Sequence, residues 1–277
     1  MEHPPSFTLA ICQMAVAAGE PARNCTTATQ MIAEASRLGA AVALLPECCD
    51  LGWTDPSAHT LAEPVPEGAT FRALADAART HGLYVCAGLA ERDGPDVYNT
   101  AVLIGPHGEL LLRHRKLNEL EIGHPFYAQG DRLGVVRTDL ATFGVMICAD
   151  AFARDLVITR TLGYMGANVI LSPCAWAVEA DHDNAREPYG ALWKACYGPP
   201  ARDFRMWIIG ASNVGPILAG PWAGRRCIGC SLVVNDQGEP VEMLPYGADA
   251  HIVRAVRITP VPRPARGCGW GQIWDTR

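Results

Sequence analysis

Cys148 occupies a position in this sequence that suits a catalytic nucleophile. It closes the apolar run Phe143–Ile147 and is followed by Ala149, Asp150 and a predicted helix. A corner between a strand and a helix presents its side chain at the sheet edge, beside backbone N–H groups that can hold an oxyanion. Asp150 either orients this corner or caps the helix that follows.

Two charged residues stand at the ends of other predicted strands. Glu47 follows the apolar run Val42–Pro46, and Lys116 follows Leu110–Arg115. An unpaired charge beside an apolar strand is costly, so we expect each of them to have a partner. If they converge on Cys148, the three side chains supply a base, a cation and a thiol, which together form a catalytic set.

The elements that must position these residues form a mixed α/β pattern, because short β-rich runs alternate with longer amphipathic stretches. The predicted strands are Phe7–Met14, Ala41–Pro46, Leu83–Ala90, Val97–Ile104, Leu110–Arg113, Leu133–Thr138, Phe143–Cys148, Val169–Ser172, Met206–Ser212, Ile228–Val234 and His251–Val256. The predicted helices are Pro21–Leu38, Thr70–Thr80, Arg154–Tyr164 and a segment near Tyr189–Tyr197.

The two halves of the chain resemble each other. The stretch Gly39–Pro46 matches Gly166–Pro173 at an offset of 166 − 39 = 127 residues. Gly108 and Gly238 mark similar hairpin turns at an offset of 238 − 108 = 130 residues. Two similar halves predict one four-layer α/β domain, residues 1–259, with two facing sheets and helices outside. We expect residues 260–277 to wrap over this domain or a neighbouring subunit.

The composition argues against several classes of function. Of the 277 residues, 49% are hydrophobic, which excludes global disorder. The net charge of −6 gives no general attraction to nucleic acid. No run reaches the roughly 20 apolar residues of a membrane span. The eleven cysteines are an odd number in a chain too long to need disulfides, so we expect a cytoplasmic protein. The charge and the absence of a long apolar run predict that it has neither membrane nor nucleic-acid partners.

Common motifs of serine hydrolases, phosphate-binding loops and zinc proteases are absent from the sequence. It contains no Gly-x-Ser-x-Gly, no Gly-x-x-x-x-Gly-Lys and no His-Glu-x-x-His. Cys227 and Cys230 form a CxxC pair, but no second ligand pair accompanies it, so we interpret both as buried structural thiols. We therefore predict neither a metal nor a cofactor.

Three blocks of the sequence resemble the signature blocks of the nitrilase superfamily of carbon–nitrogen hydrolases, in order and in spacing. These are Leu45–Glu47, His114–Leu117 and Ile147–Asp150. The similarity covers residues 7–257 and includes Val97–Ala101 and Trp207–Asn213. The resemblance implies an αββα sandwich that associates through its helices into a homodimer or larger homo-oligomer.

The resemblance also implies a role for each of the three residues. By this likeness, Cys148 is the nucleophile, Glu47 the general base and Lys116 the cation that stabilises the transition state. Lys116 and the backbone N–H of Ala149 would face the substrate oxygen. The implied chemistry is hydrolysis of a carbon–nitrogen bond through a Cys acyl-enzyme, without metal or cofactor.

Further site residues are expected around these three. Many members of the superfamily carry a second glutamate soon after the lysine, for which we favour Glu121 over Glu119. Tyr127 lies in a stretch that resembles the family's aromatic and Gly-Asp segment, and is expected to contact substrate. Trp53 and Trp176 follow the two matched strands, so they either line one pocket or pack in the core.

The long connection over residues 177–203 is polar and rich in aromatic side chains, as expected of a segment that covers a pocket or meets a partner chain.

The substrate class is predicted from departures from the family pattern. Nitrilases typically follow the nucleophile with Trp-Glu, where this chain has Ala149 and Asp150. Carbamoylases often place an arginine shortly after the cysteine, whereas the first arginine here is Arg154. These departures favour a small amide as substrate, with an N-carbamoyl compound second and a nitrile third. A non-catalytic binding or scaffold protein of the same fold is the alternative from a different class.

Overall fold

The computed structural model describes residues 5–262, which contain two six-stranded sheets and one smaller sheet. The first sheet has the order β15 (Ile252–Ile258), β1 (Phe7–Gln13), β2 (Val42–Leu44), β3 (Tyr84–Asp93), β4 (Asp96–Ile104), β5 (Leu110–Arg115). The second has the order β14 (Pro240–Met243), β13 (Leu232–Val234), β10 (Trp207–Ser212), β8 (Val169–Cys174), β7 (Thr142–Val145), β6 (Val135–Arg137). The small sheet is β11 (Val214–Pro216), β12 (Arg226–Ile228), β9 (Ala177–Val178).

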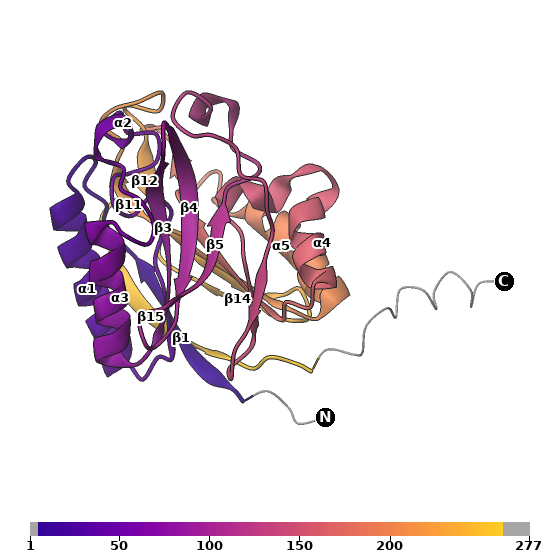
Figure 1. The fold of residues 1–277 in the computed structure, drawn as a ribbon. Coiled ribbons are helices and arrows are strands. Elements are labelled where there is room, and N and C mark those ends of the chain that lie inside the picture. Colours follow the sequence, from indigo (N-terminus) through magenta and orange to yellow (C-terminus); the bar gives the residue numbers. More distant parts are fainter. Residues whose placement is uncertain (1–4, 263–277) are drawn as a thin grey trace.

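Helices cover the outer faces of the two large sheets (Figure 1). Helices α1 (Pro21–Arg37) and α3 (Ala69–His81) pack on the first sheet through one apolar cluster. Helices α4 (Val157–Tyr164) and α5 (Ala191–Phe204) pack on the second sheet through another. The remaining helical segments are short: α2 (Ala58–Leu61), η1 (Glu121–Gly123), η2 (Cys148–Phe152) and η3 (Arg154–Leu156).

A third apolar cluster lies between the two large sheets. It joins aliphatic and aromatic side chains from both inner faces, such as Leu9 and Ile11 from the first sheet and Val145 and Leu171 from the second. These residues are fully buried, and burial of apolar surface is the main source of stability for such a core. The layers are therefore helix, sheet, sheet, helix, and the predicted four-layer αββα fold is confirmed.

The sequence repeat corresponds to a repeat of topology. The first sheet has the order β15-β1-β2-β3-β4-β5. Taken from its β6 edge, the second sheet has the corresponding order β6-β7-β8-β10-β13-β14. In both sheets the second, third and fourth strands of this series pair in parallel, and the outer pairs are antiparallel. The turns at Gly108 and Gly238 close the β4–β5 and β13–β14 hairpins, as predicted.

Two predicted elements are divided in the structure. The predicted strand Ile228–Val234 ends at Ile228 and resumes at Leu232 in a different sheet, because Gly229 and Cys230 both adopt positive φ. The predicted helix Arg154–Tyr164 becomes η3 followed by α4, because Asp155 and Leu156 adopt left-handed conformations. Left-handed backbone in non-glycine residues has little sequence signature, so neither break was predicted.

Most of the predicted C-terminal segment, residues 260–277, lies outside the described residues, which end at position 262. Within residues 5–262, none of the helices has both the length and the apolar character needed to cross a membrane.

Candidate active site

Glu47 lies in a tight corner between the two large sheets. Its side chain is 1% exposed, and its backbone N–H donates to the carbonyl oxygen of Cys174 at the end of β8, at 3.2 Å. Gly88 on β3 allows this approach, because a Cβ atom there would lie 2.6 Å from the Glu47 Cα. The neighbouring strands therefore fix the Glu47 backbone on both sides.

Lys116 directly follows β5 and is 2% exposed. Its Nζ donates to Glu47 Oε1 at 2.8 Å and to Glu119 Oε1 at 2.8 Å. The side-chain amide of Asn99 on β4 donates to the same two residues, at 2.7 Å to Glu47 Oε1 and 2.9 Å to Glu119 Oε2. These four side chains form the carboxylate cluster, in which one ammonium and one amide bridge two acids.

The structure places Glu119 in this cluster, and not Glu121, which the sequence favoured. Glu121 begins the short helix η1 and is exposed, whereas the Glu119 side chain is 4% exposed and bonded to Lys116. Glu119 lies three residues after Lys116, and the chain turns back between them so that the two side chains meet. Sequence spacing alone did not fix this turn, because the segment after β5 has no regular periodicity.

Cys148 begins η2 three residues after β7 ends, and its φ of 43° is unusual for a residue other than glycine. Such strain persists only where the surrounding structure holds it, and it is frequent at functional sites. Cys148 is partly accessible and lines the same cavity as Glu47 and Lys116, so the structure brings all three predicted residues together. Ala149 also lines it, in the first turn of η2, where backbone N–H groups have no partner within the helix.

The Asp150 carboxylate ties the Cys148 corner to the segment that carries Lys116. It accepts hydrogen bonds from the backbone N–H of Ile147 at 2.9 Å and of Asn118 at 2.8 Å, and it contacts His114 Nε2 at 2.8 Å. Asp150 therefore closes the first turn of η2 and orients the corner, but it does not cap the predicted helix that follows, because η3 and α4 have Ala153 and Leu156 at their N-caps. These bonds and the His114 charge outweigh burial and lower the pKa of Asp150.

Burial and mutual charge shift the pKa values in the site. Burial raises the pKa of Glu47, and the charge of Lys116 opposes this rise. Burial alone would lower the pKa of Lys116, but the charges of Glu47 and Glu119 outweigh it and hold the pKa well above its usual value. Burial, the neighbouring Cys174 and Glu47 raise the pKa of the Cys148 thiol well above its usual value. The raised pKa of Cys148 disfavours its thiolate, so the sulfur needs a base to remove its proton.

The cavity at Cys148 has a volume of about 160 Å³. Trp53 and Trp176 both line it, so each contributes to the pocket while remaining largely buried. Tyr127 does not line this cavity, contrary to the sequence-based expectation of substrate contact. Its hydroxyl accepts a hydrogen bond from the backbone N–H of Thr54 at 3.0 Å and lies 3.6 Å from Cys48 Sγ. Tyr127 therefore supports the loop that carries Trp53.

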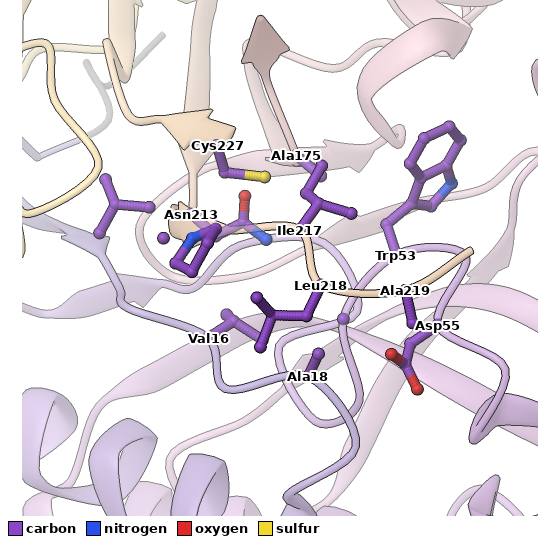
Figure 2. Close-up of a pocket in the computed structure, with 14 residues that line it drawn as sticks. Val16, Ala18, Trp53, Asp55, Ala175, Asn213, Ile217, Leu218, Ala219 and Cys227 are labelled. Carbon is purple, nitrogen blue, oxygen red and sulfur yellow. The ribbon is translucent and has the colours of Figure 1, made fainter. Parts of the chain in front are cut away.

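A second, smaller cavity adjoins the first. Its volume is about 30 Å³, against about 160 Å³ for the larger cavity. It shares Trp53 and Ala175 with the larger cavity, and Asn213 and Cys227 also line it (Figure 2). The Oδ1 atom of Asn213 has no hydrogen-bond partner among the described residues. The 160 Å³ cavity holds Cys148 together with Glu47 and Lys116 and is therefore the candidate site.

Several residues of the site were not predicted individually. Phe152 and Trp222 were not considered, and Asn99 appeared only as part of a family-like stretch. Tyr189 and Trp193 lie in the aromatic connection that was expected to cover a pocket or meet a partner chain, and both line the cavity. Within residues 5–262, no group of three His, Cys, Asp or Glu residues is arranged to hold a metal ion.

The fold and the site define an enzyme of the carbon–nitrogen hydrolase class. The chain belongs to the carbon–nitrogen hydrolase family, whose model matches residues 8–259. A nitrilase from Pyrococcus abyssi is 34% identical over 229 residues, which cover 81% of this chain and 79% of the relative. An omega-amidase from Bos taurus is 31% identical over 84% of this chain and 83% of its own length.

The fold is also similar to that of solved amidases. The crystal structure of an amidase from Nesterenkonia sp. has a TM-score of 0.77 with this chain at 22% sequence identity. The match covers 99% of this chain and 98% of the amidase. The similarity extends over the whole four-layer architecture.

Proposed function

We propose that this protein hydrolyses the C–N bond of a small amide through a Cys148 acyl-enzyme, giving a carboxylic acid and ammonia or an amine. The single observation that carries the proposal is the carboxylate cluster beside the Cys148 cavity, in which Lys116 Nζ lies 2.8 Å from Glu47 Oε1. The names of the relatives, nitrilase and omega-amidase, support carbon–nitrogen chemistry.

In the acylation step, Glu47 accepts the Cys148 proton as the sulfur attacks the amide carbonyl carbon. The raised pKa of the thiol makes this base necessary, and the raised pKa of Glu47 makes its carboxylate a better proton acceptor. Negative charge then develops on the substrate oxygen, where Lys116 and the backbone N–H of Ala149 stabilise it. Collapse of the tetrahedral intermediate breaks the C–N bond, and Glu47 passes its proton to the departing nitrogen.

Deacylation repeats the sequence with water as the nucleophile. Glu47 removes a proton from the water, whose oxygen attacks the thioester carbon, and the C–S bond breaks to release the acid. The sulfur regains a proton, which restores the starting thiol. Both steps use Glu47 as the base and Lys116 as the cation, while the Cys148 sulfur attacks in the first step and leaves in the second. All three side chains line a single cavity.

The proposal is tested with three propyl compounds: butyramide, N-carbamoyl-propylamine and butyronitrile. Ammonia release is measured, together with the intact protein mass after acid quenching. We expect ammonia from butyramide and a mass increase of one butyryl group. Preference for either of the other compounds would replace the amide with the N-carbamoyl or nitrile alternative. Absence of ammonia and of any adduct across a panel of amides would identify a binding protein instead.

Replacing Glu119 with glutamine separates the two candidate glutamates. Glu119→Gln removes one of the two acids that hold Lys116, so Lys116 pairs more closely with Glu47 and weakens it as a base. We expect kcat/KM for butyramide to fall by about a hundredfold. Glu121→Gln is the matched control, and because Glu121 is exposed we expect kcat/KM to change less than about twofold. Equal losses in the two variants would contradict the assignment.

A further inference from the structure

Aromatic side chains form much of the wall of the cavity at Cys148. Six aromatic side chains line it, and they come from separate segments of the chain: Trp53, Phe152, Trp176, Tyr189, Trp193 and Trp222. Most of the remaining lining is aliphatic, such as Leu120 and Leu192. Apart from Glu47 and Lys116, no charged side chain among residues 5–262 lines the cavity. The wall beyond the reacting groups is therefore apolar.

The aromatic wall is held in place by its own packing. The rings of Trp176 and Trp193 stack with centroids 4.5 Å apart and an angle of 21° between their planes. The hydroxyl of Tyr189 accepts a hydrogen bond from Trp193 Nε1 at 2.8 Å. Gly210 on β10 leaves room behind the stack, since a Cβ atom there would lie 3.0 Å from the Trp176 ring. The wall is consequently a preformed surface.

A carboxylate on the substrate would find no cationic partner in this cavity. Lys116 already bridges Glu47 and Glu119, so the reacting centre carries two acids against one ammonium. Arg154 is exposed and does not line the cavity, and Arg225 is paired with Glu179. The indole N–H of Trp176 has no partner among residues 5–262, but a neutral donor does not balance a full charge. Burial of an unpaired carboxylate is strongly unfavourable.

A cationic substrate is disfavoured for a different reason. Aromatic rings attract cations through their faces, but several faces here are already used. Lys116 Nζ lies 5.6 Å from the Trp53 ring centroid, and the Arg225 guanidinium lies 4.4 Å from that of Trp222. Trp176 and Trp193 stack on each other. Four of the six rings therefore already have a cation or another ring as a partner.

The volume of the cavity sets the size of the acyl group. An apolar cavity of about 150 Å³ in another protein binds benzene, and this cavity is about 160 Å³. We propose that the enzyme selects amides whose acyl group is uncharged, apolar and about the size of a benzene ring or a branched six-carbon chain. The aromatic wall rejects amides that carry a carboxylate on that group. This inference rests on the proposed amide hydrolysis.

Amides matched in shape but not in charge test the inference. Isocaproamide has an isopropyl group where succinamate has a carboxylate. Betaine amide has a quaternary nitrogen where tert-butylacetamide has a quaternary carbon. We expect kcat/KM for isocaproamide to exceed that for succinamate by about a hundredfold or more. For tert-butylacetamide against betaine amide, we expect a ratio of about tenfold or more. Faster turnover of succinamate or of betaine amide would overturn the inference and leave amide hydrolysis intact.

Binding to the Cys148→Ala variant gives a readout that does not depend on turnover. Calorimetry should show the uncharged amide of each pair binding more tightly than its charged counterpart. Equal or tighter binding of the charged amides would overturn the inference even if turnover favours the uncharged ones. If none of the four amides yields ammonia or an acyl adduct with the unmodified enzyme, amide hydrolysis itself fails, and this result is distinct from a change of preference.

A cation placed in the wall should change the preference. Leu192 on α5 lines the cavity and is 54% exposed, so it lies where the cavity meets solvent. In Leu192→Arg, we expect the ratio of kcat/KM for isocaproamide to that for succinamate to fall by about tenfold. Leu192→Gln is the matched control, with similar length but no charge, and should leave the ratio within about twofold of the unmodified enzyme. An unchanged ratio in Leu192→Arg would contradict the claim that the missing cation excludes carboxylates.

Discussion

Replacement of Cys148 with alanine is expected to abolish amide hydrolysis, with kcat falling by at least roughly 10⁴-fold. The change removes the attacking atom, and among residues 5–262 no second Cys and no Ser or Thr lines the cavity. The acyl adduct seen after acid quenching should disappear at the same time. Ammonia release and intact mass measure the two effects independently.

The fold should survive this change, because Cys148 is partly accessible and alanine removes only the sulfur. We expect the circular dichroism spectrum to be unchanged and Tm to shift by no more than a few degrees. Cys227→Ala is the matched control, since Cys227 lines the smaller neighbouring cavity but not the larger one (Figure 2). It should retain both the adduct and the activity. Retention of the adduct in Cys148→Ala would eliminate the proposed nucleophile.

The positions of Glu47, Lys116 and Cys148 could be predicted because they depend on short-range features. Each residue follows an apolar strand, and strands of this pattern are recognised from their periodicity. The repeat over 127 residues identified the facing sheets, since each half repeats the same series of strands. Local pattern and repeat together were enough to predict the four-layer fold.

The remaining features depend on backbone conformations that the residue types do not reveal. The choice between Glu119 and Glu121 depends on how the chain turns after β5, and no periodic pattern covers that segment. Cys148, Cys230 and Leu156 adopt positive φ although none of them is glycine. At these positions tertiary contacts override local preference, which a single sequence does not record.

The aromatic wall was only partly predictable for a related reason. Trp53 and Trp176 follow matched strands, so their place could be inferred from the repeat. Trp222 comes from the loop between β11 and β12, a hairpin of the small sheet that was not predicted. Its contact with Trp53, at 4.8 Å between ring centroids, joins segments about 170 residues apart in the sequence. Selectivity therefore depends on contacts that only the folded chain brings together.

Replacement of Glu47 with glutamine is expected to lower the rate of acylation by about 10²–10⁴-fold, the usual contribution of a general base. Glutamine is close to glutamate in size, so the hydrogen bond from Asn99 and the packing under Gly88 can persist. What is lost is the group that accepts the Cys148 proton. Rapid-quench measurement of the acyl adduct reports this step directly, and an unchanged acylation rate would contradict the role of base.

The pH dependence distinguishes loss of the base from a structural defect. Activity needs the ionised form of Glu47, so kcat/KM should rise as pH increases through the pKa of this group. Burial raises that pKa, so kcat/KM should rise at a pH above about 4.3, the usual pKa of glutamate. Glu47→Gln should lose the rise altogether. Glu119→Gln should keep it but move it to lower pH, because removing the neighbouring negative charge of Glu119 favours ionised Glu47. A rise that persists unchanged in Glu47→Gln would show that another group titrates, and would assign the base elsewhere.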